Sequence, residues 1–220
     1  MDTHVTEDQQ LAALKQWWKE NGSSIITGVV LGFAALFATK AWFAWQEQIA
    51  RNASDVYVTM NAAQDSGDMQ VAAERAGILM TDFSNTTYAA FAALALAKQR
   101  IEENALDAAA TQLQWAIDHG KEDFVRDVAR LRLARVKLAQ GDADAAQAVL
   151  GQAGQTTDAM VLYEELRGDI EYARGNQQAA AAAYSQALAA MGSEYPGRAL
   201  LQLKYEDIAA AAGTSAGDAQ

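Results

Sequence analysis

The sequence has no cysteine, one proline and two histidines among its 220 residues. Without cysteine the chain can form no disulfide, thiolate zinc site or cysteine nucleophile, although its compartment stays open. The scarcity of proline and the abundance of alanine predict helix throughout. Neither His4 nor His119 belongs to a Ser-His-Asp set or a metal-ligand cluster, and no glycine-rich phosphate loop is present. We therefore expect no catalytic residue, no metal and no cofactor.

Positive charge is also scarce, with 17 Lys and Arg against 28 Asp and Glu, for a formal net charge of −11. Such a surface repels phosphate backbones, so we expect no nucleic-acid binding. Hydrophobic residues make up 51% of the chain, too many for a disordered protein. The mean hydropathy is nevertheless slightly negative, which excludes a polytopic membrane protein. The main body should therefore face water.

One segment differs from this soluble body. Residues 21–39 are 19 consecutive residues without a charge, close to the roughly 20 that span a bilayer. Trp17 and Trp18 precede the segment, and Trp42 and Trp45 follow it, as in the aromatic belts at membrane interfaces. This pattern predicts a retained single-span anchor in contact with lipid.

Two alternatives fit less well. A buried core helix does not usually have tryptophan pairs at both boundaries, and a cleaved signal peptide needs small residues where bulky aromatics stand. The orientation is not determined by charge, because Lys15 and Lys19 lie before the segment while Lys40 and Arg51 lie after it.

Within the predicted span, Ser24, Gly28 and Gly32 recur every fourth residue. Such a stripe allows another helix to approach closely, but small residues are also common in membrane helices, so both interpretations stay open. Ahead of the span, the capping-box pattern at residues 6–9 predicts a short amphipathic helix at the membrane surface.

From about Gln46 onward the chain repeats. Residues that tolerate a left-handed conformation recur at intervals of 37, 37 and 34, namely at Gly67, Asn104, Gly141 and Gly175. Small or apolar residues keep a fixed phase to these breaks. The position seven residues before each break holds Met60, Ala97, Ala134 and Gly168, and the position five residues after it holds Ala72, Ala109, Ala146 and Ala180. The position nine residues after each break holds Ala76, Leu113, Leu150 and Tyr184, and the position twelve residues after it holds Leu79, Ala116, Ala153 and Ala187.

This phase predicts closely packed helical hairpins, which must stack because no single hairpin buries its apolar face alone. The last unit, with Gly168, Gly175, Ala180, Tyr184 and Ala187, resembles the tetratricopeptide motif. The expected fold class is therefore all-α: a transmembrane helix, a tetratricopeptide-like solenoid and a C-terminal capping helix. The cap should present Leu200, Leu201, Leu203, Tyr205 and Ile208. The expected organisation is an N-terminal stub with its short helix at 1–20, the anchor at 21–46, the tetratricopeptide-like domain at 47–212 and a flexible tail at 213–220.

A stack of hairpins offers an inner surface formed by the first helix of each unit. The phase gives eight candidate groove residues: Tyr57, Asn61, Phe91, Lys98, Arg135, Glu165, Asp169 and Tyr172. Aromatic and charged residues together suit weak binding of extended polypeptide, but the same residues could serve as contacts between repeats. Arg126 and Arg130 share a helix face, where they could meet acids of a neighbouring repeat or an acidic client, and we favour the neighbouring repeat.

Short strings along nearly the whole chain resemble the YfgM family, the ancillary subunits of the bacterial SecYEG translocon. They include Glu20-Asn21-Gly22 before the span, Gly28 to Gly32 within it, Asn85 to Tyr88, Leu131 to Val136, and Leu166-Arg167-Gly168. The resemblance implies an inner-membrane protein with a cytoplasmic N-terminus and a periplasmic repeat domain. It also implies association with SecYEG and the chaperone PpiD, and assistance to emerging, unfolded polypeptides.

Two further functions remain as alternatives to this translocon role. One is a membrane-anchored scaffold of an envelope complex unrelated to Sec. The other is a hydrolase that uses only carboxylates, which would need paired acids to converge in a closed pocket.

Overall fold

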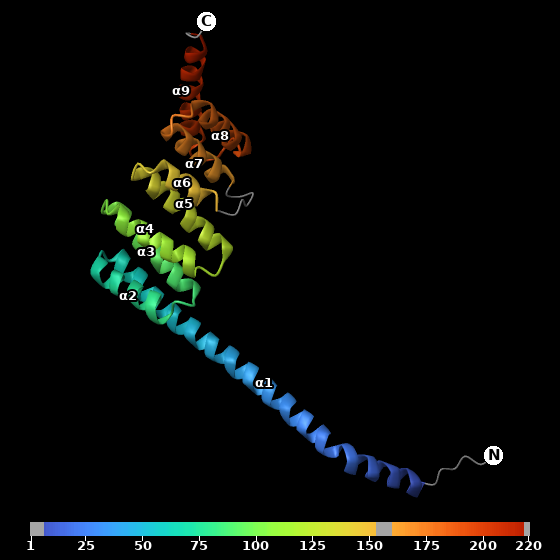
Figure 1. Ribbon diagram of the computed structural model, residues 1–220. Coiled ribbons are helices and arrows are strands. Elements are labelled where there is room, and N and C mark those ends of the chain that lie inside the picture. Colours follow the sequence, from blue (N-terminus) through green and yellow to red (C-terminus); the bar gives the residue numbers. More distant parts are fainter. Residues whose placement is uncertain (1–6, 153–159, 218–220) are drawn as a thin grey trace, which may run out of the picture. The chain divides into compact units, whose positions relative to one another are not determined.

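The computed structural model describes residues 7–152 and 160–217, and within these ranges every regular element is a helix (Figure 1). The described helices are α1 (Glu7–Asp65), α2 (Met69–Asp82), α3 (Thr87–Glu102), α4 (Leu106–His119), α5 (Asp123–Ala139), α6 (Ala143–Leu150), α7 (Met160–Ala173), α8 (Gln177–Ala190) and α9 (Arg198–Gly217). The all-α prediction is confirmed. The chain divides into a unit that ends at Arg51 and a second that begins at Asn52.

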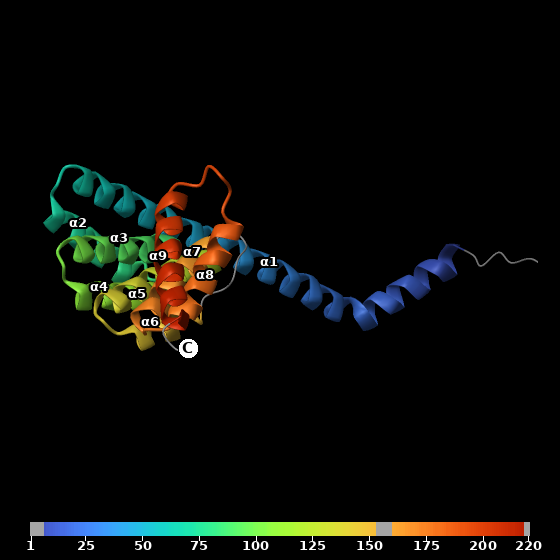
Figure 2. The ribbon, with the colours of Figure 1, turned by 90° about the horizontal axis from the view of Figure 1, so that it is seen from above.

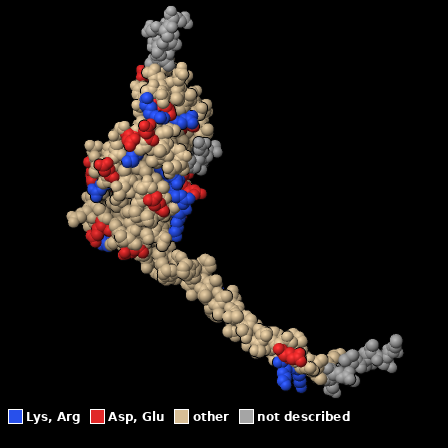
Figure 3. All heavy atoms as spheres, viewed as in Figure 1, with Lys and Arg blue, Asp and Glu red and all other residues tan. Residues whose placement is uncertain are grey.

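The first unit is the N-terminal part of α1. Its apolar side chains face outward, and only 6% of the most apolar stretch is buried, so this is not the core helix of a soluble protein. Trp17, Trp18, Trp42 and Trp45 are all exposed. In the view of Figure 3 the middle of this helix shows no charged residue, whereas charged residues appear towards its N-terminal end. The helix is long and apolar enough to cross a membrane.

The predicted short amphipathic helix is not a separate element, because α1 has no break between Glu7 and Asp65. The stretch holds no proline, and each internal glycine costs only about 1 kcal/mol relative to alanine, which does not end a long helix. Thr6, the first residue of the capping-box pattern, lies outside the described residues.

The second unit turns at the four predicted breaks. Gly67, Asn104, Gly141 and Gly175 have φ values of 80°, 57°, 83° and 81°, in the left-handed region. At the first turn, the Gly67 N–H donates to the Gln64 carbonyl (3.0 Å), and the next N–H, of Asp68, donates to the Ala63 carbonyl (2.9 Å). The same two bonds recur at the other three breaks. Each hairpin therefore closes with a Schellman motif, which satisfies carbonyls at the end of its first helix.

The small residues that set the repeat phase lie at helix–helix contacts. Ala72, Ala109, Ala146 and Ala180 are at most 1% exposed. In the last hairpin, a Cβ added to Gly168 would lie 2.3 Å from Cε1 of Tyr184, so only hydrogen fits there. Ala153, one of the predicted positions, lies outside the described residues.

Four core clusters connect successive elements. The first joins the C-terminal part of α1 to α2 and α3, the second joins α3, α4 and α5, the third joins α5, α6 and α7, and the fourth joins α7, α8 and α9. Each cluster combines a hairpin with the helix that follows it. The helices from α2 to α9 are therefore stacked in chain order (Figures 1 and 2).

The capping helix α9 buries only part of its predicted apolar set. Leu201 and Ile208 are buried against α8 and Tyr205 is partly buried, whereas Leu200 and Leu203 face solvent. The helix runs to Gly217, five residues beyond the predicted end of the ordered domain at Ala212. Four consecutive alanines before Gly213 favour helix strongly enough to carry it through that glycine.

Candidate functional site

The first helices of the repeats carry the candidate surface. At its N-terminal end, the ring of Tyr57 on α1 lies 6.2 Å from Phe91 and 5.5 Å from Tyr88, both on α3. All three rings are half-buried, as is Asn61. The structure thus brings together two of the predicted residues and adds Tyr88, which the repeat phase had not selected. The cluster joins the first two repeats and still presents aromatic edges to solvent.

The two candidate residues in the middle of the stack are cationic. Lys98 on α3 forms an exposed ion pair with Glu102 (3.7 Å), of a kind worth at most about 1 kcal/mol. Arg135 on α5 is exposed and lines a small hollow together with Arg132. The lysine is therefore weakly held, whereas Arg132 and Arg135 stand beside an apolar hollow.

Among the residues that the structure describes, Arg126 and Arg130 pair with acids on their own helix, whereas the prediction was pairing with a neighbouring repeat. Arg130 contacts Asp127 at 3.0 Å, and Arg126 contacts Asp123. Arg126 also donates to the carbonyls of Gly120 (2.6 Å) and Lys121 (2.8 Å). An acid three residues ahead lies on the same face of the helix, which places it within reach of each arginine.

At the C-terminal end, two predicted groove acids are bound within the chain. Lys204 of α9 donates to Asp169 (2.8 Å) and Glu165 (3.3 Å) on α7. The Tyr184 hydroxyl of α8 also donates to Asp169 (2.7 Å). These contacts fasten α9 to the last hairpin, whereas Tyr172 stays exposed. Repeat phase could not reveal Lys204, because it stands 35 residues beyond Asp169 and outside the repeat.

This network shifts two pKa values. Burial, together with the hydrogen bond to Asp169 and the nearby negative charges, raises the pKa of Tyr184 well above its usual range. Burial alone would lower the pKa of Lys204, but its bonds and charge interactions with Asp169 and Glu165 outweigh this and raise it. Both groups therefore hold their protons more firmly in the folded chain.

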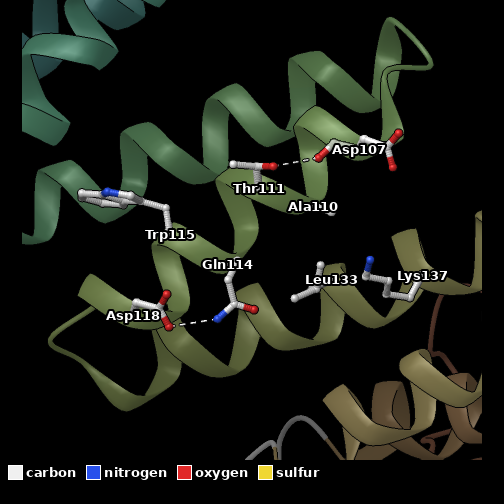
Figure 4. A pocket seen from close by; sticks show the side chains of 8 residues that line it. All are labelled: Asp107, Ala110, Thr111, Gln114, Trp115, Asp118, Leu133 and Lys137. Carbon is white, nitrogen blue, oxygen red and sulfur yellow. Dashed lines mark hydrogen bonds between the residues drawn. The ribbon is translucent and has the colours of Figure 1, made fainter.

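A second hollow, of about 610 Å³, lies between α4 and α5 (Figure 4). Its carboxylates are not free, because Asp118 accepts a hydrogen bond from Gln114 (2.9 Å) and Asp107 accepts one from Gln140 (2.7 Å). Asp107 and Asp118 stand at opposite ends of the hollow in Figure 4. They do not form the converging acid pair that a carboxylate hydrolase needs.

The histidine of α4 has a structural contact. His119 stacks on Trp115 with ring centroids 4.1 Å apart, and its Nδ1 lies 3.0 Å from the Trp115 carbonyl oxygen. It thus caps the end of α4, as a histidine in a last turn commonly does. Across the described part of the chain, no three His, Asp or Glu side chains are grouped so as to hold a metal ion.

The small-residue stripe of the anchor is exposed. A Cβ added to Gly28 or Gly32 would meet no atom within 4 Å. Nothing in the described chain covers these positions, and contact with another helix at Ser24, Gly28 and Gly32 stays a prediction.

These features define the class of protein. It is a stack of helical hairpins, closed by a capping helix, that follows a single exposed apolar helix. A family model described as a tetratricopeptide repeat-like domain matches residues 15–210. This match covers most of the chain and agrees with the repeat deduced from the sequence.

Curated relatives narrow the class. The chain is 34% identical to the ancillary SecYEG translocon subunit of Escherichia coli (strain K12), over 84% of this chain and 88% of the relative. The protein of that name from Haemophilus influenzae is 32% identical, over 83% and 89% respectively. The one from Neisseria gonorrhoeae is 30% identical, over 94% and 100%. The chain belongs to the family of ancillary SecYEG translocon subunits, which confirms the resemblance noted in the sequence.

Proposed function

We propose that this chain is an ancillary, non-catalytic subunit of the SecYEG translocon, and that its repeat domain helps to pass translocated polypeptides to periplasmic chaperones. The observation that carries the proposal is the similarity to translocon subunits over more than four fifths of the chain. The exposed apolar helix of α1 supports it, because a translocon subunit needs an anchor.

The proposed location is the bacterial inner membrane. The chain crosses it once, with the N-terminus in the cytoplasm and the repeat domain in the periplasm. The proposed partners are SecYEG, the chaperone PpiD and emerging unfolded polypeptides.

The mechanism we propose is proximity. An anchor that keeps the repeat domain near the channel exit raises its effective concentration for emerging chains, so that each contact can be weak. Exposed and half-buried groups such as Tyr57, Phe91 and Tyr172 suit this task, since they offer apolar contact without a deep pocket. Glu165 and Asp169 contribute less, because Lys204 already holds them.

The test is affinity purification of the full chain from membranes in mild detergent. Recovery of SecY and PpiD supports the proposal. Recovery of a different envelope complex, with no Sec subunit, supports the alternative scaffold function instead.

A double substitution tests whether the small residues of the anchor contact the translocon. Gly28→Leu combined with Gly32→Leu should lower recovery of SecY while membrane insertion persists, because leucine blocks close helix approach but remains apolar. The matched control is Val29→Leu with Val30→Leu in the same stretch, which should co-purify SecY like the parent. If the glycine variant does so too, the stripe makes no contact with the translocon.

A further inference from the structure

The smaller hollow, beside Arg132 and Arg135, lies where the turn between α3 and α4 meets α5. It measures about 200 Å³ and is lined almost entirely by carbon. The lining comprises Ile101, Leu106, Val136, Ala139 and the side chains of Arg132 and Arg135. The surface is thus a small apolar depression with two guanidinium groups beside it.

In the part of the chain that the structure describes, two arginines line this hollow without an acidic partner, unlike several other arginines of the repeat domain. Arg132 and Arg135 are three residues apart on α5, so they share one face of the helix, and both are exposed. Arg126, Arg130, Arg167 and Arg174 all hold carboxylates. Within residues 7–152 and 160–217, neither Arg132 nor Arg135 has an ion pair or side-chain hydrogen bond.

The acids at the end of α3 make ion pairs with other residues: Glu102 contacts Lys98 at 3.7 Å, and Glu103 contacts Arg100 at 2.6 Å. In a chain of net charge −11, two unpaired guanidiniums at the edge of an apolar depression form a local site for an anion.

We propose that this hollow binds an extended polypeptide segment in which an aliphatic side chain stands next to a carboxylate. The aliphatic group enters the depression, and the carboxylate accepts hydrogen bonds from Arg132 and Arg135. The planar guanidinium fork matches a carboxylate in two-point contact. This assignment rests on the proposed function and names the chemistry of the chains that the repeat domain receives.

The size of the depression favours a peptide. Sites for drug-sized ligands measure about 300–1,000 Å³, so a hollow of about 200 Å³ is small for them and for a fatty acyl chain. It is suited to a single aliphatic side chain presented by an extended backbone.

The test measures fluorescence polarisation of short labelled peptides with the full chain in detergent micelles. The probe carries two Leu-Glu pairs in a Gly-Ser background. We expect saturable binding that weakens about tenfold or more when Gln replaces Glu or Asn replaces Leu, because the first change removes charge-assisted hydrogen bonds and the second the apolar contact. Equal binding of the Glu and Gln peptides overturns the proposal, as does equal or tighter binding of a Leu-Lys peptide.

Protein variants locate the site. Arg132→Gln with Arg135→Gln should lower affinity for the Leu-Glu peptide about tenfold or more, and the corresponding Lys pair should restore part of it. The matched control, Arg75→Gln with Lys121→Gln, removes the same charge elsewhere and should bind like the parent. If both glutamine variants lose affinity equally, only net charge attracts the peptide and the proposed site is wrong.

Co-purification separates this proposal from the function on which it rests. The Arg132→Gln/Arg135→Gln variant should still recover SecY, because the anchor is unchanged. Peptide binding by the parent without any recovery of SecY would defeat the translocon function alone. Recovery of SecY by a parent chain that does not bind the peptide would defeat the site alone.

Discussion

Residue 168 shows how tightly the hairpins are packed. Gly168 faces the ring of Tyr184, and even a methyl group there would overlap the ring. The repeat phase predicted close packing at this column, which holds Met60, Ala97 and Ala134 in the other units, but it did not name Tyr184 as the partner. A small residue at a fixed position of the repeat indicates that the backbones of two helices approach closely there. It does not indicate which larger residue lies opposite.

Gly168→Ala should therefore destabilise the repeat domain by about 1–3 kcal/mol, the usual cost of overpacking. The measurement is the urea midpoint of the full chain in detergent, followed by circular dichroism. Gly77→Ala is the matched control: an added Cβ meets no atom within 4 Å there, and alanine should stabilise α2 by about 0.5–1 kcal/mol. A Gly168→Ala variant as stable as the parent would contradict the close packing.

The raised pKa values of Tyr184 and Lys204 should make the stability of the folded chain decrease at alkaline pH. Both pKa values are raised by folding, so the folded chain keeps protons that the unfolded chain loses near pH 10. The stability they contribute is complete below that pH and is lost progressively as pH rises from there towards the higher pKa values of the folded chain. Urea midpoints measured between pH 8 and about 11 should fall, and should fall less steeply in Tyr184→Phe. Identical slopes for parent and variant would refute the role of this tyrosine.

Single contacts outside the repeat phase could not be predicted. Asp169 occupies a regular groove position, yet its partners are the Tyr184 hydroxyl and Lys204 on the capping helix. The sequence indicated which face the carboxylate occupies but not that another helix covers it. A capping helix obeys no repeat, so its contacts depend on tertiary packing alone.

Among the elements, α9 has one buried face and one exposed face. Leu201 is 1% exposed and packs in the last core cluster, whereas Leu203, two residues on, is 63% exposed. A capping helix needs one apolar face to cover the last hairpin, and its other face can be polar. Apolar content alone did not reveal which leucines are buried.

Leu201→Ala should cost about 2–5 kcal/mol, as expected for a buried leucine, while Leu203→Ala should change stability by no more than about 0.5 kcal/mol. Both substitutions remove the same atoms from the same helix. Thermal unfolding of the two variants beside the parent measures the difference. Equal melting temperatures would mean that α9 does not seal the core.

The boundaries of α1 and α9 were the least predictable features of the elements. The sequence predicted a short helix, an anchor and a first repeat helix, but one helix includes all three from Glu7 to Asp65. The composition changes along that length, from amphipathic to apolar to amphipathic again, but no residue interrupts the backbone. Composition thus indicates whether a stretch of helix lies in lipid, in water or against a core. Where the helix begins and ends depends on capping and helix-breaking residues.

At the scale of the whole molecule, the absence of cysteine permits a clean test of topology. Gln70→Cys and Lys15→Cys each introduce the only thiol of the chain, at exposed positions on α2 and α1. With a membrane-impermeant maleimide and cells whose outer membrane is permeabilised, we expect labelling of the Gln70→Cys variant alone. The Lys15→Cys variant should react only after the inner membrane is disrupted. The reverse pattern would overturn the proposed orientation.

The four Schellman turns have a consequence for how the chain folds. Each turn is bonded within six consecutive residues, and each core cluster joins elements that follow one another in the chain. A hairpin can therefore form as soon as roughly one repeat of chain is available, without waiting for distant partners. A protein built this way can fold progressively from its N-terminal end while its own C-terminal half is still being threaded through a pore.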